Sequence, residues 1–197
     1  MTYNPLDKGI NLDQIAQTAI DNWSVDQYGL KFPYNSMREN PIRGNAHDEK
    51  VFYSMEGVSG HAGLFGDVKD LEILVKLLLN GGSYNNVTLF NQETLDLFTS
   101  PVGTDDTYGI GWRLAGNNKA MTWMMGDYVS NKAYGHTGFT DMVTVIDPKE
   151  NLGIILLTDK PQSQQLSKGK FASTSDYVTP NYGPIMTMVQ EDLQKAN

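Results

Sequence analysis

Residues 135–138 (Gly-His-Thr-Gly) combine the residue types of a site that moves protons and binds a carbonyl oxygen. A histidine side chain can exchange a proton near neutral pH, and Thr137 places a hydroxyl next to His136. Glycines on both sides let the backbone approach a ligand closely, so that strand amides can stabilise an oxyanion. The four residues alone also fit a turn around a buried structural histidine, and the neighbouring segments must decide between the two interpretations.

The other two histidines lie in residues 44–49 (Gly-Asn-Ala-His-Asp-Glu) and 57–65 (Gly-Val-Ser-Gly-His-Ala-Gly-Leu-Phe). His47 and the two acidic residues after it suggest metal ligands. However, three consecutive residues rarely converge on one ion, and no partner pair lies at helical spacing. We therefore expect no metal site. His61 lies between glycine and alanine, and we expect it to be packed and hydrogen-bonded in support of the site.

The two segments at 44–49 and 57–65 are followed by residues 108–112 (Tyr-Gly-Ile-Gly-Trp) and then by 135–140 (Gly-His-Thr-Gly-Phe-Thr). In this order and spacing they resemble the β-lactamase-like serine hydrolases, a family that includes class C β-lactamases, DD-carboxypeptidases and related esterases. The penicillin-binding protein 4B group is the most similar. The resemblance extends from residues 3–6 (Tyr-Asn-Pro-Leu) to the C-terminal region, and it covers nearly the whole chain.

The resemblance implies that the full-length relative works through an acyl-enzyme, formed when a serine attacks a D-Ala-D-Ala peptide, a β-lactam or an ester. His136, Thr137 and Gly138 match the third motif of the family. The backbone N–H of Phe139 would supply half of the oxyanion hole, and His47 and His61 would lie near the rim of the pocket. No cofactor is implied. The partner would be a small-molecule or peptidoglycan-peptide substrate.

The first family motif, Ser-x-x-Lys, and the second, Tyr-x-Asn, should lie upstream of the region that this chain matches. Residues 167–170 (Ser-Lys-Gly-Lys) satisfy the first pattern, but they follow the third motif in a polar stretch. The chemistry needs a serine and a desolvated lysine one turn apart at the start of a buried helix. Residues 84–86 (Tyr-Asn-Asn) fit the second pattern after a glycine-terminated helix. We expect neither to be catalytic, so no nucleophile is expected in this chain, which would be inactive alone.

Two interpretations of the function remain open. The chain is either the C-terminal part of such an enzyme, which its abrupt beginning in the middle of the family domain favours, or a non-catalytic binding or regulatory relic of the same fold. Asp141 stands where relatives often have a glycine, and it adds a negative charge near the rim. Peptidase, β-lactamase and esterase activities are all still possible.

Composition narrows the choice of partners. The 197 residues contain 15 Lys and Arg against 23 Asp and Glu, a formal net charge of -8. Such a chain has no basic cluster for nucleic acid and is repelled by an anionic membrane surface. There is no cysteine, which excludes disulfides and thiolate chemistry. No signal peptide is recognisable at Met1, although the resemblance implies an extracytoplasmic place, periplasmic or at the cell surface, for the full-length relative.

The elements that position these residues follow from periodicity. Residues 12–20 predict a helix with Asn11 as its N-cap, and residues 21–66 predict loops. A helix capped by Asp67 and ended by Gly81 and Gly82 is predicted next. Its apolar face comprises Val68, Leu71, Leu74, Val75 and Leu78. A short helix that begins at Asn91 and buries Leu95 and Phe98 should follow it.

The remaining elements are strands and one helix. Residues 108–114 predict a strand, and further strands are predicted over residues 134–138, 142–146 and 152–158. The last two form a hairpin whose turn begins at Asp147 and Pro148. A final helix begins near Tyr182, and its apolar face comprises Ile185, Met188, Val189 and Leu193. Helices and strands are segregated, which favours an α+β fold with an antiparallel sheet covered by the C-terminal helix, a partial serine β-lactamase/DD-peptidase fold.

We expect residues 1–197 to be the C-terminal portion of one transpeptidase-like domain, with a helical and loop part over about 1–107 and the sheet and terminal helix over about 108–197. The resemblance implies that segments outside this chain contribute to the sheet and pack beside the final helix. An open sheet edge and an apolar helix face then favour association, so a homodimer through these elements is expected.

Overall fold

The chain folds into two compact units. The computed structural model describes residues 1–19, 42–117, 119–159, 165–167, 170–171 and 182–196. The first unit contains the described residues of 1–67 and 159–176, and the second contains those of 68–158 and 177–197. The expected division near residue 107 stays a prediction, and each unit is described by itself.

The first unit consists of short elements. Two 3-10 turns, η1 (Pro5–Lys8) and η2 (Leu12–Gln14), precede β1 (Gln17–Ala19), which pairs antiparallel with β2 (Ile42–Arg43). The helix α2 (Glu49–Ser54) follows, and β9 (Gln165–Ser167) pairs antiparallel with β10 (Lys170–Phe171). Ile42 and Val51 are fully buried and anchor β2 and α2.

The helix expected over residues 12–20 is wrong. Asn11 caps only the single turn η2, in which the Gln14 side chain accepts a hydrogen bond from the Asn11 amide at 3.3 Å. The next residues leave the helical path because they pair with β2, and the Arg43 guanidinium donates to the Ile15 carbonyl at 2.6 Å. Residue 20 lies outside the described residues. The loop expected over 21–66 is also wrong in part, because α2 lies within it.

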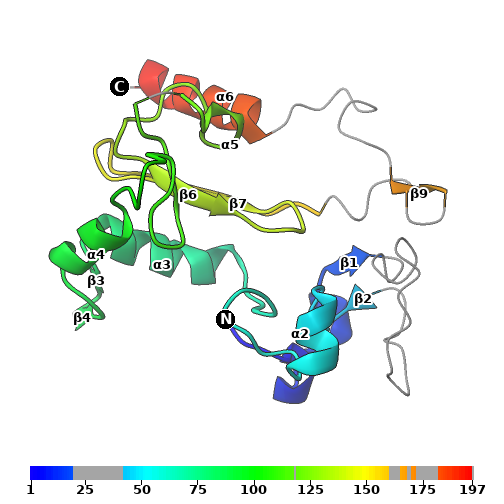
Figure 1. Cartoon of the computed structure of the whole chain (residues 1–197). Coiled ribbons are helices and arrows are strands. Elements are labelled where there is room, and N and C mark those ends of the chain that lie inside the picture. Colours follow the sequence, from blue (N-terminus) through cyan, green and yellow to red (C-terminus); the bar gives the residue numbers. More distant parts are fainter. Residues whose placement is uncertain (20–41, 118, 160–164, 168–169, 172–181, 197) are drawn as a thin grey trace. The chain divides into compact units, whose positions relative to one another are not determined.

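The second unit is a four-stranded antiparallel sheet between two layers of helices (Figure 1). The strand order is β5 (Arg113–Leu114), β6 (Tyr134–Thr137), β7 (Val143–Asp147) and β8 (Leu152–Leu156). The helices α3 (Val68–Leu79) and α4 (Gln92–Phe98) cover one face through Val75, Leu78 and Leu95. The helices α5 (Thr122–Met125) and α6 (Tyr182–Ala196) cover the other. The α+β class, the hairpin and the C-terminal helix are therefore confirmed.

The strand expected over residues 108–114 is shorter than predicted. Only Arg113 and Leu114 form β5, while Tyr108 makes an isolated bridge to Arg113. The Gly109 amide bonds the Trp112 carbonyl at 2.9 Å, and Gly111 has a φ of 76°. The positive φ at Gly111 suits glycine, and a Cβ on Gly109 would lie 2.4 Å from the Phe98 carbonyl oxygen. These two constraints explain why the glycines interrupt the strand.

The expected apolar faces of the two long helices are only partly correct. In α3, Val75 and Leu78 are buried together with Leu77, whereas Val68 and Leu74 are exposed. In α4, which Asn91 caps as expected, Leu95 is buried but Phe98 is 41% exposed.

The helix α6 buries a different face from the one its apolar residues predict. Its buried residues are Gly183, Met186 and Gln190. A Cβ on Gly183 would lie 2.4 Å from the Thr122 carbonyl oxygen, so only glycine lets the two helices approach this closely. The Gln190 amide donates to the Met125 carbonyl at 2.8 Å and accepts from the Tyr128 amide at 3.1 Å. These polar contacts with α5 and the loop after it decide the orientation of α6.

Candidate functional site

The Gly-His-Thr-Gly segment lies on β6 and at the start of the connection to β7. His136 pairs with Thr144 and Thr137 pairs with Val143. The connection is closed by a bond from the Gly138 amide to the Met142 carbonyl at 2.8 Å. The strand placement predicted for this segment is therefore confirmed.

Gly135 has a structural reason to be glycine. A Cβ at this position would lie 2.3 Å from the backbone oxygen of Thr144 and 3.2 Å from the Cα of Val145. Any larger residue would push β7 away from β6. The flanking glycine therefore holds the strand that carries His136 tightly in the sheet.

His136 is exposed, and one of its ring nitrogens is already engaged. Its Nδ1 lies 2.7 Å from the Thr137 carbonyl oxygen. A carbonyl oxygen can only accept, so Nδ1 carries the hydrogen in this arrangement. In the neutral ring, Nε2 then keeps its lone pair and can accept a proton from a bound molecule. The side chain of Phe139, three residues further along the chain in the connection to β7, is 73% exposed.

Asp141 adopts a backbone conformation that glycine prefers. Its φ is 64°, its amide bonds the Gly138 carbonyl at 3.1 Å, and the Thr158 hydroxyl donates to its carbonyl. This left-handed conformation explains why a glycine fits the position. Burial, and then the nearby Asp141 carboxylate, raise the pKa of Tyr182 at the start of α6. Asp141 therefore adds a negative charge to the end of the hairpin that carries His136.

His61 belongs to a small polar cluster in the first unit. The Ser59 hydroxyl and His61 Nδ1 are 2.7 Å apart, and His61 Nε2 lies 3.8 Å from the Asp48 carboxylate. The other Asp48 oxygen caps α2 by accepting from the Val51 amide at 2.9 Å. His61 is hydrogen-bonded as expected, but its side chain is 57% exposed rather than packed. His47 is half-buried in the turn before α2.

The structure therefore brings His136, Thr137, Gly138 and Phe139 together in one hairpin, and it places His47 and His61 around the start of α2. The contact between His61 and Asp48 could not be predicted from the sequence pattern, because the two residues lie in different segments of the chain. The N-cap position of Asp48 and the Ser-x-His spacing were the features that could have indicated this cluster.

Neither chance motif has the geometry that catalysis needs. Ser167 lies in β9 and is paired with Lys170 in β10, so this Ser-x-x-Lys is part of a hairpin and not of a helix. Tyr84 ends the short strand β3 (Ser83–Tyr84), and a two-residue turn with positive φ joins it to β4 (Val87–Thr88). Such a turn has the geometry of an ordinary tight hairpin.

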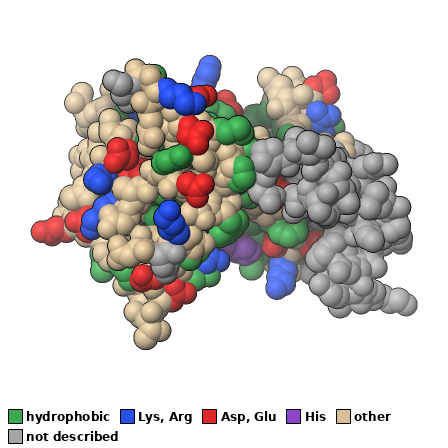
Figure 2. Space-filling model, turned by 90° about the horizontal axis from the view of Figure 1, so that it is seen from above, with side chains coloured by type: hydrophobic (Ala, Val, Ile, Leu, Met, Phe, Trp, Pro, Cys, Tyr) green, Lys and Arg blue, Asp and Glu red, His purple; other side chains and the backbone are tan. Residues whose placement is uncertain are grey.

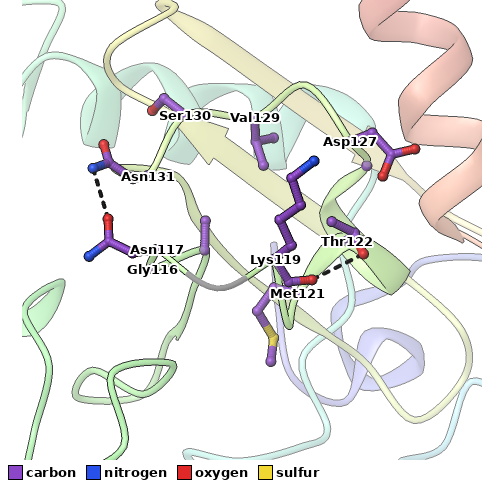
Figure 3. Close-up of a pocket in the computed structure, with 11 residues that line it drawn as sticks. Gly116, Asn117, Lys119, Met121, Thr122, Asp127, Val129, Ser130 and Asn131 are labelled. Carbon is purple, nitrogen blue, oxygen red and sulfur yellow. Dashed lines mark hydrogen bonds between the residues drawn. The ribbon is translucent and has the colours of Figure 1, made fainter.

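A cavity of about 220 Å³ lies at the other end of β6 (Figure 3). The described residues that line it lie at 115–117, 119, 121–122, 126–127 and 129–131. On one side of it the Asn131 side-chain Nδ2 donates to the Asn117 side-chain Oδ1 at 3.2 Å. These segments precede Tyr134, where β6 begins, whereas His136 and Thr137 end the strand. The cavity therefore does not hold the predicted site residues.

Within the described ranges, no group of three or more His, Cys, Asp or Glu side chains is placed to hold a metal ion. None of the helices formed by those residues is both long and apolar enough to cross a membrane.

Tyr134, which precedes the motif on β6, is 1% exposed, and its hydroxyl has no hydrogen-bond partner among the described residues. Its ring packs edge-on against Trp112 at 5.1 Å. A buried hydroxyl without a partner costs about 1–3 kcal/mol. We therefore expect Tyr134→Phe to leave the free energy of unfolding unchanged or to raise it, as chemical denaturation at pH 7 would show. A loss above about 1 kcal/mol would mean that the hydroxyl has a partner.

The same variant makes a prediction about alkaline pH. Burial raises the pKa of Tyr134 in the folded protein. Between the unfolded value, near 10, and the higher folded value, the unfolded chain loses a proton that the folded chain keeps. The contribution of Tyr134 to the free energy of unfolding is therefore fully present below about pH 10, and it decreases as the pH rises above that value. Tyr134→Phe should show a smaller loss of stability between about pH 10 and 11 than the unchanged chain. An equal loss in both would contradict this.

Comparison with known proteins finds similarity over most of the chain. A family model described as Beta-lactamase matches residues 14–176. The chain is 45% identical over 195 residues to a Bacillus subtilis protein named N-acetylmuramyl-L-alanine amidase, covering 98% of this chain and 43% of that protein. It is 47% identical over 161 residues to an Escherichia coli protein named Putative D-alanyl-D-alanine carboxypeptidase, covering 82% of this chain and 36% of that protein. The chain thus spans less than half the length of these relatives.

Proposed function

Because this chain belongs to the β-lactamase family, we propose that it is the part of a serine hydrolase that carries the strand beside the active site. The complete enzyme would form an acyl-enzyme with a D-Ala-D-Ala peptide or a related cell-wall amide, outside the cytoplasm. The observation that supports this most is the exposed His136 at the end of β6, with Nε2 left to exchange a proton.

We assign roles to the residues of the hairpin by their chemistry. His136 Nε2 would take part in proton transfer or bind the carboxylate end of the substrate. The Thr137 hydroxyl would donate a hydrogen bond to the same end, and the Phe139 amide would supply half of the oxyanion hole. The nucleophile would come from the portion of the relatives that lies outside the match, since Ser167 is part of a hairpin.

The substrate class is proposed from the relatives' names. One is named for D-alanyl-D-alanine and the other for an amide next to L-alanine, and both names describe amide bonds of alanine peptides. We therefore favour peptide amides over esters and β-lactams. A non-catalytic relic is the second candidate, favoured by the hairpin geometry of the Ser-x-x-Lys match.

An assay of the full-length protein that contains this sequence would separate these functions. Purified protein is incubated with a D-Ala-D-Ala peptide, N-acetylmuramyl-L-alanine and a neutral ester, and the released D-alanine, L-alanine and acid are quantified. We expect D-alanine release that a penicillin blocks. No release from any of the three substrates by a folded protein would support the relic instead.

A further inference from the structure

The connection between β6 and β7 is held in one shape by hydrogen bonds to its backbone. The Gly138 amide bonds the Met142 carbonyl at 2.8 Å, and the Asp141 amide bonds the Gly138 carbonyl at 3.1 Å. When the register of β7 and β8 is extended by two residues, Thr158 lies opposite Asp141, and its hydroxyl donates to the Asp141 carbonyl. These three bonds fix the backbone of Asp141 relative to the strand that carries His136.

The backbone at Asp141 has a conformation that a side chain makes costly. Its φ of 64° lies in the left-handed region, which glycine adopts freely and which residues with a Cβ adopt at a cost. A glycine, which relatives often have here, would remove this cost and keep the three bonds, because all of them use only the Asp141 backbone. The shape of the connection therefore does not require a carboxylate. Strained residues of this kind gather at functional sites.

The carboxylate of Asp141 lies near the start of α6, at the end of the hairpin that carries the proposed site. It lies close enough to the Tyr182 hydroxyl to raise the pKa of that group. The Tyr182 hydroxyl is buried, and its ring packs against the core cluster that contains Met186. Asp141 itself is half-buried, in the same connection as the exposed Phe139. A half-buried charge is screened less by water and salt than a fully exposed one, so Asp141 acts on groups that approach this end of the hairpin.

The sign of this charge bears on which substrates the site accepts. A carboxylate repels an anionic group brought close to it and attracts a cationic one. Figure 2 looks onto the side of the molecule that carries α6, and acidic and basic side chains are interspersed over the described surface in that view. Because no broad patch of one sign is visible there, the local field near the hairpin depends on individual side chains such as Asp141.

We propose that Asp141 is a specificity-determining residue, which selects alanine peptides that carry a free amine close to the scissile amide. The ammonium group lies against the Asp141 carboxylate, and the scissile amide lies between it and the carboxylate end of the substrate at Thr137. An uncharged or anionic group in place of the ammonium loses this attraction or is repelled. The inference rests on the proposed function, because it needs a peptide bound beside His136.

The test compares two peptides that differ only in this charge. The full-length protein that contains this sequence is assayed with acetyl-Lys-D-Ala-D-Ala, whose side-chain amine is free, and with the same peptide acetylated on that amine. We expect kcat/KM for D-alanine release to be at least about 10-fold higher for the free amine. The difference should shrink when salt is raised from about 0.05 to 0.5 M, because salt screens the attraction.

Failure of this inference is distinguishable from failure of the proposed function. If both peptides are cleaved with equal kcat/KM, Asp141 does not select for an amine, and the proposed function still holds. If neither peptide is cleaved by the folded protein, the proposed function is wrong and this inference is wrong with it.

Matched variants show whether the preference comes from Asp141. Asp141→Asn keeps the size of the side chain and removes its charge, and Asp141→Gly also relieves the backbone at φ 64°. Each should reduce the preference to about 2-fold or less, mainly through a higher KM for the free amine. Glu150→Gln is the control, since it removes an exposed carboxylate from the turn at the other end of β7, and it should keep the preference. A preference that survives in both Asp141 variants, or that Glu150→Gln abolishes as well, would overturn the proposal.

Discussion

Asp147→Ala is expected to lower the free energy of unfolding of the second unit by about 3 kcal/mol or more. Asp147 ends β7 and is 1% exposed, yet its carboxylate is fully used. It accepts from the Ser130 amide and hydroxyl, both at 2.6 Å, and from the Lys149 amide at 3.2 Å. Alanine would remove three acceptor contacts at once and leave the half-buried Ser130 amide and hydroxyl without their partner, which costs more than the bonds themselves contribute.

Two control variants test whether the loss of stability comes from the buried hydrogen bonds of Asp147 or from removal of a carboxylate in general. Ser130→Ala removes only one of the bonds to Asp147, so about 1 kcal/mol is expected. Asp192→Ala on α6 removes an 81%-exposed carboxylate and should change little. Thermal and urea unfolding of the three variants would check the order. If Asp147→Ala melted within about 2 °C of the unchanged chain, the buried carboxylate would not organise the β7–β8 turn.

His136→Ala in the full-length protein is expected to reduce turnover of a D-Ala-D-Ala peptide by about 100-fold or more. The imidazole is exposed at the end of β6. Its Nδ1 bonds the Thr137 carbonyl, which leaves Nε2 able to accept a proton from the substrate. The substitution removes no buried contact, so folding should be preserved. The rate loss would then report chemistry or substrate binding.

Lys132→Ala provides the matched control, because Lys132 is exposed just before Tyr134, where β6 begins, whereas His136 lies toward the other end of the strand. Steady-state kinetics of both variants, with circular dichroism to verify folding, would separate kcat from KM. Unchanged kcat/KM in a folded His136→Ala protein would remove His136 from the site. A loss confined to KM would mean that His136 only binds the substrate.

The sequence predicted the part of the fold in which local pattern and tertiary contacts agree. The segment from Tyr134 to Leu156 combines apolar strand runs with a turn signal at Asp147 and Pro148, and the structure has all three predicted strands, β6, β7 and β8. The same segment carried the candidate site. Its motif needs only adjacent residues, so it could be found without knowledge of the fold.

Long-range contacts decided what the sequence could not predict. Residues 17–19 became a strand because residues 42–43 pair with them. The buried face of α6 was set by the fit of Gly183 and Gln190 to α5, which no periodicity reveals. The cluster of Asp48, Ser59 and His61 likewise depends on a loop returning to the start of α2.

The central claim is that this chain supplies the strand beside an active site whose nucleophile lies in the rest of the protein. Labelled penicillin followed by intact mass spectrometry tests it most directly, on the chain alone and on the full-length protein that contains it. We predict no covalent adduct on the chain alone and one adduct on the full-length protein, carried by a serine outside residues 1–197 of this sequence. A stoichiometric adduct on any serine of this chain, Ser167 included, would contradict it.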